Sequence, residues 1–564
     1  MLDNHDISGI LNQYAKLLDL HNGNPFKVKS IASAAYNIKK IGEHLAELDE
    51  EALQKIPLLG KGLASKIYEI NQTGSFEELN DLLLSTPKGV LDILNIKGLG
   101  PKKVEILWRT VGITDIPELL DACRENRLVE IKGFGYKTQA QIISDIEFKF
   151  NQEGKFHWAK MQAIVSLLNE SFKSNSGVKR FSVAGDYRRY NDIIESINYV
   201  LIPSDISNPY FLKNIAASLA DKNITYTQVP ENSNTIQLLY NEVVRINLYC
   251  TELNNWGHLL LEKTATTAHL ELINFNSLSS NYETEEQVYE ALKLPYIIPE
   301  LREGLNELKH LEQQNELITY KDLKGVLHNH TTYSDGLHTL SEMATHAQSM
   351  GLEYIGICDH SQSATYANGL KPERVLEQMK EIDTLNEKFA KNGPTFKILK
   401  GIESDILGDG NLDYSTDILR LFDIVVASIH SNLKMEMDKA HSRLIGAIEN
   451  PYTTIIGHPT GRLLLMRPGY PINHEYIIDA CVSNGVAIEL NAHPYRLDMD
   501  WRWIDYAINK GAMISINPDA HQKEGLSDMQ YGVNVARKGY LTAANCLNGL
   551  SLLDFEKWIE NKRK

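Results

Sequence analysis

The chain has 564 residues, which is too long for a single hydrophobic core, so several domains are expected. Its formal net charge of −16 argues against a protein coated in basic surface for nucleic acid, and any such grip must come from local contacts. No uncharged apolar run is long enough to span a membrane, and the N-terminus lacks a secretory signal. The five cysteines form no CxxC pair, which favours reduced thiols and a cytoplasmic location.

Three segments within residues 1–150 repeat one pattern, in which an apolar helix end leads into a Gly-x-Gly turn and a second helix with a nearby lysine. Glycines permit a tight turn, and the start of the second helix presents free N–H groups that suit a phosphate. The repeats predict helix-hairpin-helix motifs that hold a DNA backbone without reading its sequence, with plain helix connections as the alternative. The predicted contact residues are Gly60, Gly62, Lys66, Gly98, Gly100, Lys102, Lys103, Gly133, Gly135 and Lys137.

After Gly325 the chain changes to seven short β-prone runs that alternate with helical stretches, the pattern of an α/β barrel. The runs cover residues 325–327, 354–358, 396–402, 424–429, 454–457, 486–490 and 513–517. Each run ends in a polar residue, and barrel enzymes place their chemistry at the carboxyl ends of their strands. One such histidine would be unremarkable in a core, but seven coincident cases indicate a shared site. The predicted metal ligands are His328, His330, Asp335, His360, Glu403, His430, His458, Asp519 and His521.

This ligand set narrows the chemistry. A catalytic zinc ion needs about three protein ligands, so the set is large enough for two or three divalent ions. Imidazole ligands favour manganese, zinc or iron over magnesium. Clustered divalent ions hydrolyse phosphoesters well. Asp359, next to His360, is expected to orient ligands in support of catalysis, while the Ser-Asp-Gly setting of Asp335 also fits an ordinary turn.

These residues resemble the PHP (polymerase and histidinol phosphatase) domain. The motifs His-x-His-Thr-x-Tyr-Ser-Asp-Gly, Asp-His-Ser, Gly-Ile-Glu, Ser-Ile-His, Gly-His-Pro and Asp-Ala-His occur in that order. With the segments at 24–27 and 294–303, the whole chain resembles a bacterial family X DNA polymerase. The resemblance implies a multidomain α/β protein with helical helix-hairpin-helix domains, a nucleotidyltransferase-like palm with a thumb, and a distorted (β/α)7 PHP barrel. It also implies DNA repair by manganese-dependent 3′→5′ exonuclease, 3′-end processing or abasic-site endonuclease activity.

The resemblance predicts five domains. Residues 1–85 are expected to form a helical, lyase-like DNA-binding domain, and residues 86–150 a fingers-like helix-hairpin-helix domain. The palm is expected at 151–258, the thumb and linker at 259–318, and the PHP phosphoesterase domain at 319–564.

The predicted palm departs from the family pattern of three metal-binding aspartates. Ser196 and Asn198 align with the Asp-x-Asp pair, and Asn247 aligns with the third aspartate. Asp186 replaces a serine that helps to hold the triphosphate, and its charge would repel that group. The Tyr-Phe-Thr-Gly motif has become Glu-Lys-Thr-Ala at 262–265.

Two magnesium ions need anionic oxygen ligands, which serine and asparagine cannot supply. We therefore predict a palm that keeps its fold and does not polymerise. A shifted site that uses Asp192 or Glu195 is the alternative.

The predicted function is metal-dependent hydrolysis of DNA phosphodiesters, from a 3′ end or at an abasic site. Arg462 and Arg496 near the barrel mouth are expected to contact DNA, with rim salt bridges as the alternative. Lys66 matches a lysine that forms a Schiff base with 5′-deoxyribose phosphate in some family members, and a phosphate-facing lysine is the alternative. The rival functions are a small-molecule phosphatase, a non-catalytic DNA-binding scaffold and a still-active polymerase. DNA is the expected partner, without a membrane, and the sequence names no protein partner.

Overall fold

The computed structural model describes residues 2–39, 41, 43–56, 59–96, 98–226, 234–279, 281–392 and 396–563. The chain divides into two compact units, Met1–Glu153 and Gly154–Lys564. All five cysteines are free thiols. Within the described residues, no helix is long and apolar enough to cross a membrane.

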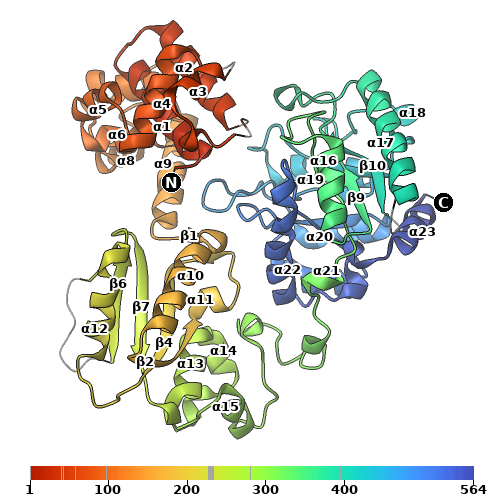
Figure 1. The fold of residues 1–564 in the computed structure, drawn as a ribbon. Coiled ribbons are helices and arrows are strands. Elements are labelled where there is room, and N and C mark those ends of the chain that lie inside the picture. Colours follow the sequence, from red (N-terminus) through yellow and green to blue (C-terminus); the bar gives the residue numbers. More distant parts are fainter. Residues whose placement is uncertain are drawn as a thin grey trace. The chain divides into compact units, whose positions relative to one another are not determined.

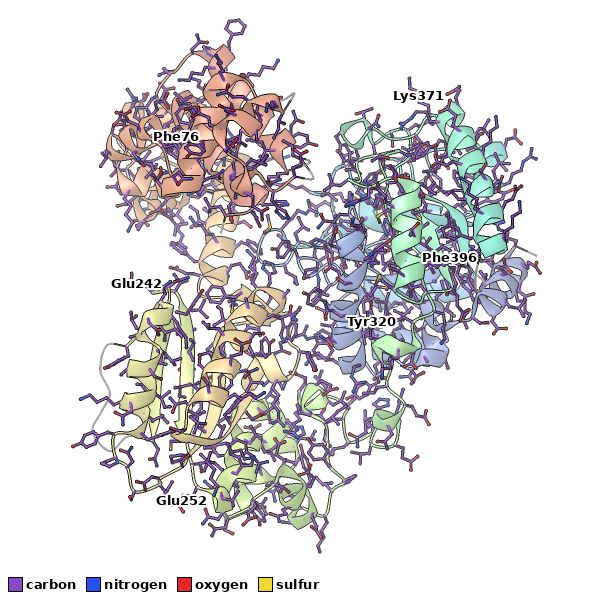
Figure 2. All side chains as sticks on the ribbon, in the orientation of Figure 1. Phe76, Glu242, Glu252, Tyr320, Lys371 and Phe396 are labelled. Atoms are coloured by element: carbon purple, nitrogen blue, oxygen red, sulfur yellow. The ribbon has the colours of Figure 1, made fainter. Side chains whose placement is uncertain are left out.

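The first unit is entirely helical within its described part. Its helices are α1 (Asn4–Leu20), α2 (Pro25–Ile38), α3 (Glu50–Lys55), α4 (Lys61–Thr73), α5 (Glu77–Leu84), α6 (Lys88–Leu94), α7 (Pro101–Glu105), α8 (Ile116–Arg124) and α9 (Tyr136–Gln152). One apolar core runs from Ile7 to Ile146, across the predicted boundary at residue 85. Phe76, labelled in Figure 2, is buried in this core. Its ring packs edge-on against that of Tyr14, with the ring centroids 4.8 Å apart.

The second and third glycine repeats share one geometry. The first glycine of each pair has a left-handed backbone, with φ of +82° at Gly98 and +93° at Gly133, and the second is the N-cap residue of α7 or α9. In the first repeat the N-cap residue is Gly60, so Gly62 lies inside α4. The prediction that these two glycines form the turn was therefore wrong by two residues. The equivalent of the left-handed glycine is position 58, which lies outside the described residues.

The second unit begins with a five-stranded sheet, the predicted palm. Its strand order is β2 (Val178–Ala184), β4 (Ser196–Pro203), β7 (Val244–Cys250), β6 (Thr235–Tyr240) and β5 (Ile224–Thr225), in which only the β4–β7 pair is parallel. Alternate residues of a strand face opposite sides. Tyr199 and its same-face neighbours in β4 pack with α10 (Trp158–Ser174) and α12 (Phe211–Ser218), whereas Val200 packs with Trp256 on the other face.

Shorter elements flank the palm sheet and connect it to the rest of the unit. Strands β1 (Phe156–His157) and β3 (Ile193–Ile194) form a separate antiparallel pair, and α11 (Gly185–Arg188) follows β2. The thumb helices are α13 (Trp256–Thr264), α14 (Thr267–Leu272) and α15 (Glu285–Ala291). They share a core that includes Tyr289 and Leu317.

The rest of the chain is a seven-stranded parallel barrel. Its strands are β8 (Gly325–Val326), β9 (Tyr354–Ile357), β10 (Lys397–Asp405), β11 (Ile424–Ser428), β12 (Ile455–Ile456), β13 (Ala487–Asn491) and β14 (Ile514–Asn517), paired in chain order. A parallel bridge between Asn329 and Ala520 joins the ends of β8 and β14, and so brings the two edges of the sheet together.

Helices surround this barrel (Figure 1). They are α16 (Leu340–Ser349), α17 (Pro372–Asn392), α18 (Thr416–Leu419), α19 (Met437–Ile448), α20 (His474–Ser483), α21 (Ile504–Asn509), α22 (Met529–Lys538) and α23 (Leu552–Lys562). The predicted α/β fold class with a (β/α)7 barrel is confirmed.

Candidate metal centre and palm site

The nine side chains predicted as metal ligands come together at the carboxyl ends of the barrel strands. Three groups have ligand atoms that lie within 4.8 Å of one another. His330 belongs to two of the groups and His360 to two, so the groups form one continuous cluster. The groups are His330, Asp335, His360 and His521; His328, His330 and Asp519; and His360, Glu403 and His430.

Glu403 lies at the centre of the cluster. One carboxylate oxygen is 3.2 Å from Nε2 of both His430 and His458, and the other is 2.8 Å from Nδ1 of His360. His458 thereby joins the cluster through Glu403. A carboxylate placed between several imidazoles can bridge two cations.

Two histidines of the cluster have pKa values that are shifted in opposite directions. Burial and the neighbouring His521 and His360 lower the pKa of His330 to about 3. Burial also opposes charge on His430, but Glu403 raises its pKa to about 10. Although Glu403 is buried, the surrounding histidines hold its pKa well below the ordinary value, so the carboxylate is anionic.

These residues fit divalent cations. Among the described residues, His328 Nε2, His330 Nδ1 and His458 Nδ1 are buried polar atoms without a hydrogen-bond partner. Such atoms are costly unless a ligand satisfies them. The donor set of imidazoles and carboxylates suits zinc, manganese or iron. Two of the predicted ligands, His458 and Asp519, also have left-handed backbones, with φ of +23° and +53°. Such strain is typical of functional sites.

Two carboxylates that the sequence did not single out orient the histidines. Glu489 Oε2 lies 2.7 Å from His328 Nδ1, and Asp405 Oδ1 lies 2.6 Å from His430 Nδ1. Each carboxylate accepts the Nδ1 proton, which leaves Nε2 free to face the cluster. Glu489 is fully buried within the apolar strand β13, and a charge in such a run was the available signal.

Asp359 belongs to none of the three groups and is engaged by neighbouring backbone and side chains. Its fully buried carboxylate accepts hydrogen bonds from the backbone and hydroxyl groups of Thr331 and Ser334 and from Gln378. It therefore anchors the loop that leads to Asp335. This geometry supports positioning of the loop and gives no contact with a reacting group.

The two arginines predicted near the barrel mouth, Arg462 and Arg496, have different partners. Arg462 donates to the Asp500 carboxylate at 2.7 Å and to the carbonyl oxygen of Arg496 at 3.1 Å, and its side chain is 15% exposed. It thus forms the rim salt bridge that was the alternative to DNA contact. Arg496 lies with Nε 3.7 Å from the Asp519 carboxylate, beside the cluster.

The three aligned positions of the palm also come together. Asn198 and Asn247 are paired across β4 and β7, and the Asn247 amide donates to Asn198 Oδ1 at 2.8 Å. The Ser196 hydroxyl lies 3.4 Å from the same oxygen. Gly185, with φ of +68°, approaches so closely that a Cβ there would lie 2.3 Å from the Asn198 amide. The site is therefore closed by neutral groups that satisfy one another.

The neighbouring carboxylates each have a cationic side chain nearby. Asp186 accepts from Arg189, which also donates to Glu303 Oε1 at 3.0 Å. Asp192 lies 3.7 Å from Arg462, and Glu195 lies 3.9 Å from Lys155.

Lys66 lines a cavity of about 660 Å³ between α2 and α4. The cavity is also lined by Lys27, Lys61, Gly60, Gly62 and Glu78. Burial, and then Lys27, lowers the pKa of Lys66, and its ammonium group pairs with Glu78.

The other lysines predicted to contact DNA differ in their pairing. Lys102 lies 3.4 Å from Asp19 and 3.6 Å from Glu105. The ammonium group of Lys103 lies over the Phe134 ring, 5.7 Å from its centroid. Lys137, by contrast, makes no ion pair within the described residues.

Comparison with known families supports this reading of the fold. A helix-hairpin-helix domain model matches residues 2–76, a SAM-like helix-hairpin-helix tandem matches 90–147, and a PHP domain matches 327–493. Fold and site thus define a PHP-domain protein with N-terminal helix-hairpin-helix domains.

Individual relatives identify the family within this class of proteins. The "DNA polymerase/3'-5' exonuclease PolX" of Bacillus subtilis (strain 168) is 33% identical over 98% of this chain and 99% of its own length. The chain therefore belongs to the bacterial family X DNA polymerases that carry a PHP domain. A "Probable phosphatase" of Thermoanaerobacter sp. (strain X514) is 30% identical over 40% of this chain and 91% of its own length.

Proposed function

We propose that this chain is a metal-dependent DNA phosphodiesterase that acts from a 3′ end or at an abasic site. The observation that carries the proposal is the cluster of nine potential ligands at the barrel mouth, with buried atoms that lack hydrogen-bond partners. The helix-hairpin-helix domains and the similarity to a 3'-5' exonuclease favour DNA over a small phosphate monoester.

The chain's own residues would prepare the site for hydrolysis. The nine clustered side chains would hold two or three divalent ions, with manganese or zinc favoured by the imidazoles. When bound, such ions activate water and stabilise charge on phosphate oxygens. Glu489 and Asp405 fix the tautomers of His328 and His430. Asp359 holds the loop that presents Asp335.

Charged residues would guide the substrate. Arg496, beside Asp519, is placed to pair with a phosphate oxygen of a strand that enters the mouth. Arg462 donates to the Arg496 carbonyl oxygen and so positions that loop. Helix N-termini after Gly60, Gly100 and Gly135 would contact the DNA backbone in the helical unit.

We further propose that the palm does not add nucleotides. Asn198 and Asn247 bond to each other and supply no anionic oxygen for magnesium. Arg189 forms ion pairs with Asp186 and Glu303. Because these carboxylates neutralise its charge, the Arg189 side chain would not hold a triphosphate.

The test uses the full chain with Mn²⁺ and two labelled duplexes, one with an ordinary 3′ end and one with an abasic site. A His328→Ala, His330→Ala variant serves as the control for the barrel site. We expect cleavage of at least one duplex by the natural chain and none by the variant. Equal cleavage by both proteins would reject the barrel as the active site. Hydrolysis of a chromogenic monoester without DNA cleavage would support a small-molecule phosphatase instead.

A second activity is favoured by the cavity at Lys66. Burial and Lys27 lower the pKa of Lys66, and a neutral amine is the form that attacks a sugar aldehyde to give a Schiff base. Borohydride trapping on a nicked abasic duplex should cross-link the natural chain and not Lys66→Ala. Equal trapping of both would leave Lys66 as a phosphate-facing lysine.

A further inference from the structure

Two segments form one side of the barrel mouth, a hairpin at 460–467 and a loop at 493–498, here called the rim. They are held together by hydrogen bonds. The Leu464 amide donates to the Tyr495 carbonyl oxygen at 2.7 Å, and the Thr460 amide donates to the Asp498 carboxylate at 3.1 Å. Arg496 therefore projects from a segment whose position depends on its neighbour.

The rim contains two strained residues. Leu465 has φ of +61° and Leu497 has φ of +43°, a region that branched apolar side chains rarely adopt. Such conformations persist only where the surroundings over-determine them. Contacts from outside the rim are consequently part of what holds it in shape.

The palm supplies those contacts. His157, at the end of β1 and 7% exposed, donates from Nε2 to the Leu464 carbonyl oxygen at 3.0 Å, and its ring lies 4.4 Å from that of Tyr495. Lys160 of α10 lies over the Tyr495 ring at 5.4 Å. Asp192, just before β3, lies 3.7 Å from Arg462.

We propose that the palm braces the rim, and that His157 and Asp192 are positioning residues for DNA binding at the metal centre. The proposal rests on the nuclease function proposed above. The connection runs from His157 and Asp192 through the rim to Arg496, which stands 3.7 Å from the ligand Asp519. A palm that adds no nucleotides would thus still position residues beside the metal centre of the barrel in the same unit.

The choice of substrate distinguishes an effect of the palm on the rim from an effect on the metal centre. A DNA strand needs the rim, whereas a small diester such as bis(p-nitrophenyl) phosphate needs only the ions. The variants are His157→Ala, His157→Gln, which keeps an N–H donor, and Asp192→Asn. Tyr210→Ala, at an exposed palm position remote from these contacts, is the control. Steady-state kinetics with Mn²⁺ and amide hydrogen exchange of the rim are measured on the full chain.

For His157→Ala we expect the KM for DNA to rise about tenfold, with kcat and small-diester hydrolysis within about twofold of the natural chain. Asp192→Asn should raise KM less, His157→Gln should recover most of the loss, and Tyr210→Ala should change nothing. Amides of 460–467 and 493–498 should exchange faster in His157→Ala. An unchanged KM with unchanged exchange, or an equal loss on both substrates, would overturn the proposal. If the natural chain cuts no DNA, the nuclease function fails, and rim exchange alone then decides the brace.

Discussion

The barrel mouth and the palm site both gather polar side chains at strand ends, but they differ in how those side chains are satisfied. In the barrel, buried ring nitrogens of His328, His330 and His458 have no hydrogen-bond partner among the described residues. In the palm, Asn198 and Asn247 bond to each other, and Arg189 is matched by carboxylates. Polar residues at strand ends can therefore either satisfy one another or leave buried atoms for a ligand. Unmatched buried donors and acceptors are the better indicator of a missing ligand.

The largest effect is expected when a side chain shared by two of the barrel's ligand groups is removed. His330 belongs to two of the three groups, so His330→Ala should remove metal from the barrel and lower DNA cleavage about a thousandfold or more. Metal content by mass spectrometry and the cleavage rate check this. His346→Ala on α16, outside the ligand groups, should keep both. Normal cleavage by His330→Ala would mean that the barrel is not the reaction centre.

A smaller effect is expected where a carboxylate acts through a ligand. Glu489→Gln keeps the shape of the side chain but loses the charge that fixes His328. The apparent affinity for Mn²⁺ should fall about 10- to 100-fold, and excess Mn²⁺ should restore most of the rate. Titration of activity against Mn²⁺ is the measurement, with the exposed Glu449→Gln as control. Unchanged affinity would show that Glu489 has no such role.

Arg188 of the palm, which does not contact the rim segments 460–467 and 493–498 in the described residues, should affect stability and not cleavage. Arg188 donates two hydrogen bonds to Glu285, whose pKa, raised by burial but lowered more by Arg302 and Arg188, falls to about 2. Because this pKa is depressed, the stabilisation is present above pH of about 4.5 and is lost as pH falls towards about 2. Arg188→Ala should cost about 2 kcal/mol near neutral pH and less in acid.

Thermal melts at pH 7 and pH 4 measure this difference. Nuclease activity at a temperature well below the melting point is the control. A loss of stability that is the same at both pH values would contradict the proposed pairing of Arg188 with Glu285.

The smallest effect concerns the helical unit. Lys137 makes no ion pair within the described residues, so Lys137→Ala should weaken binding to every DNA sequence by a similar few-fold and reduce the salt slope by about one. Lys102→Ala should cost less, because Lys102 is paired with Asp19 and Glu105. Fluorescence anisotropy at several salt concentrations checks both. Sequence-selective weakening would contradict backbone-directed binding.

The sequence predicted which side chains gather at the barrel mouth because most of them come at the end of an apolar run, where strand geometry leaves little choice of place. Whether they bind metal stays a prediction. Glu489 was missed because it lies inside such a run and its partner, His328, is distant in sequence. The position of the first turn was predicted wrongly because the Gly-x-Gly sequence at 60–62 begins two residues after the position that matches the first glycine of the other repeats. The engagement of Arg462 could not be foreseen, since Asp500 and Asp192 reach it only through tertiary folding.

The most direct test gives the full chain a 5′-labelled primer on a longer template, with Mn²⁺ and all four deoxynucleoside triphosphates in one reaction. The account predicts that the primer does not lengthen, and that any shortening disappears in the His328→Ala, His330→Ala variant. A primer that lengthens with template-directed nucleotides, in the natural chain or in the variant, would contradict the claim that the barrel cuts DNA while the palm adds nothing.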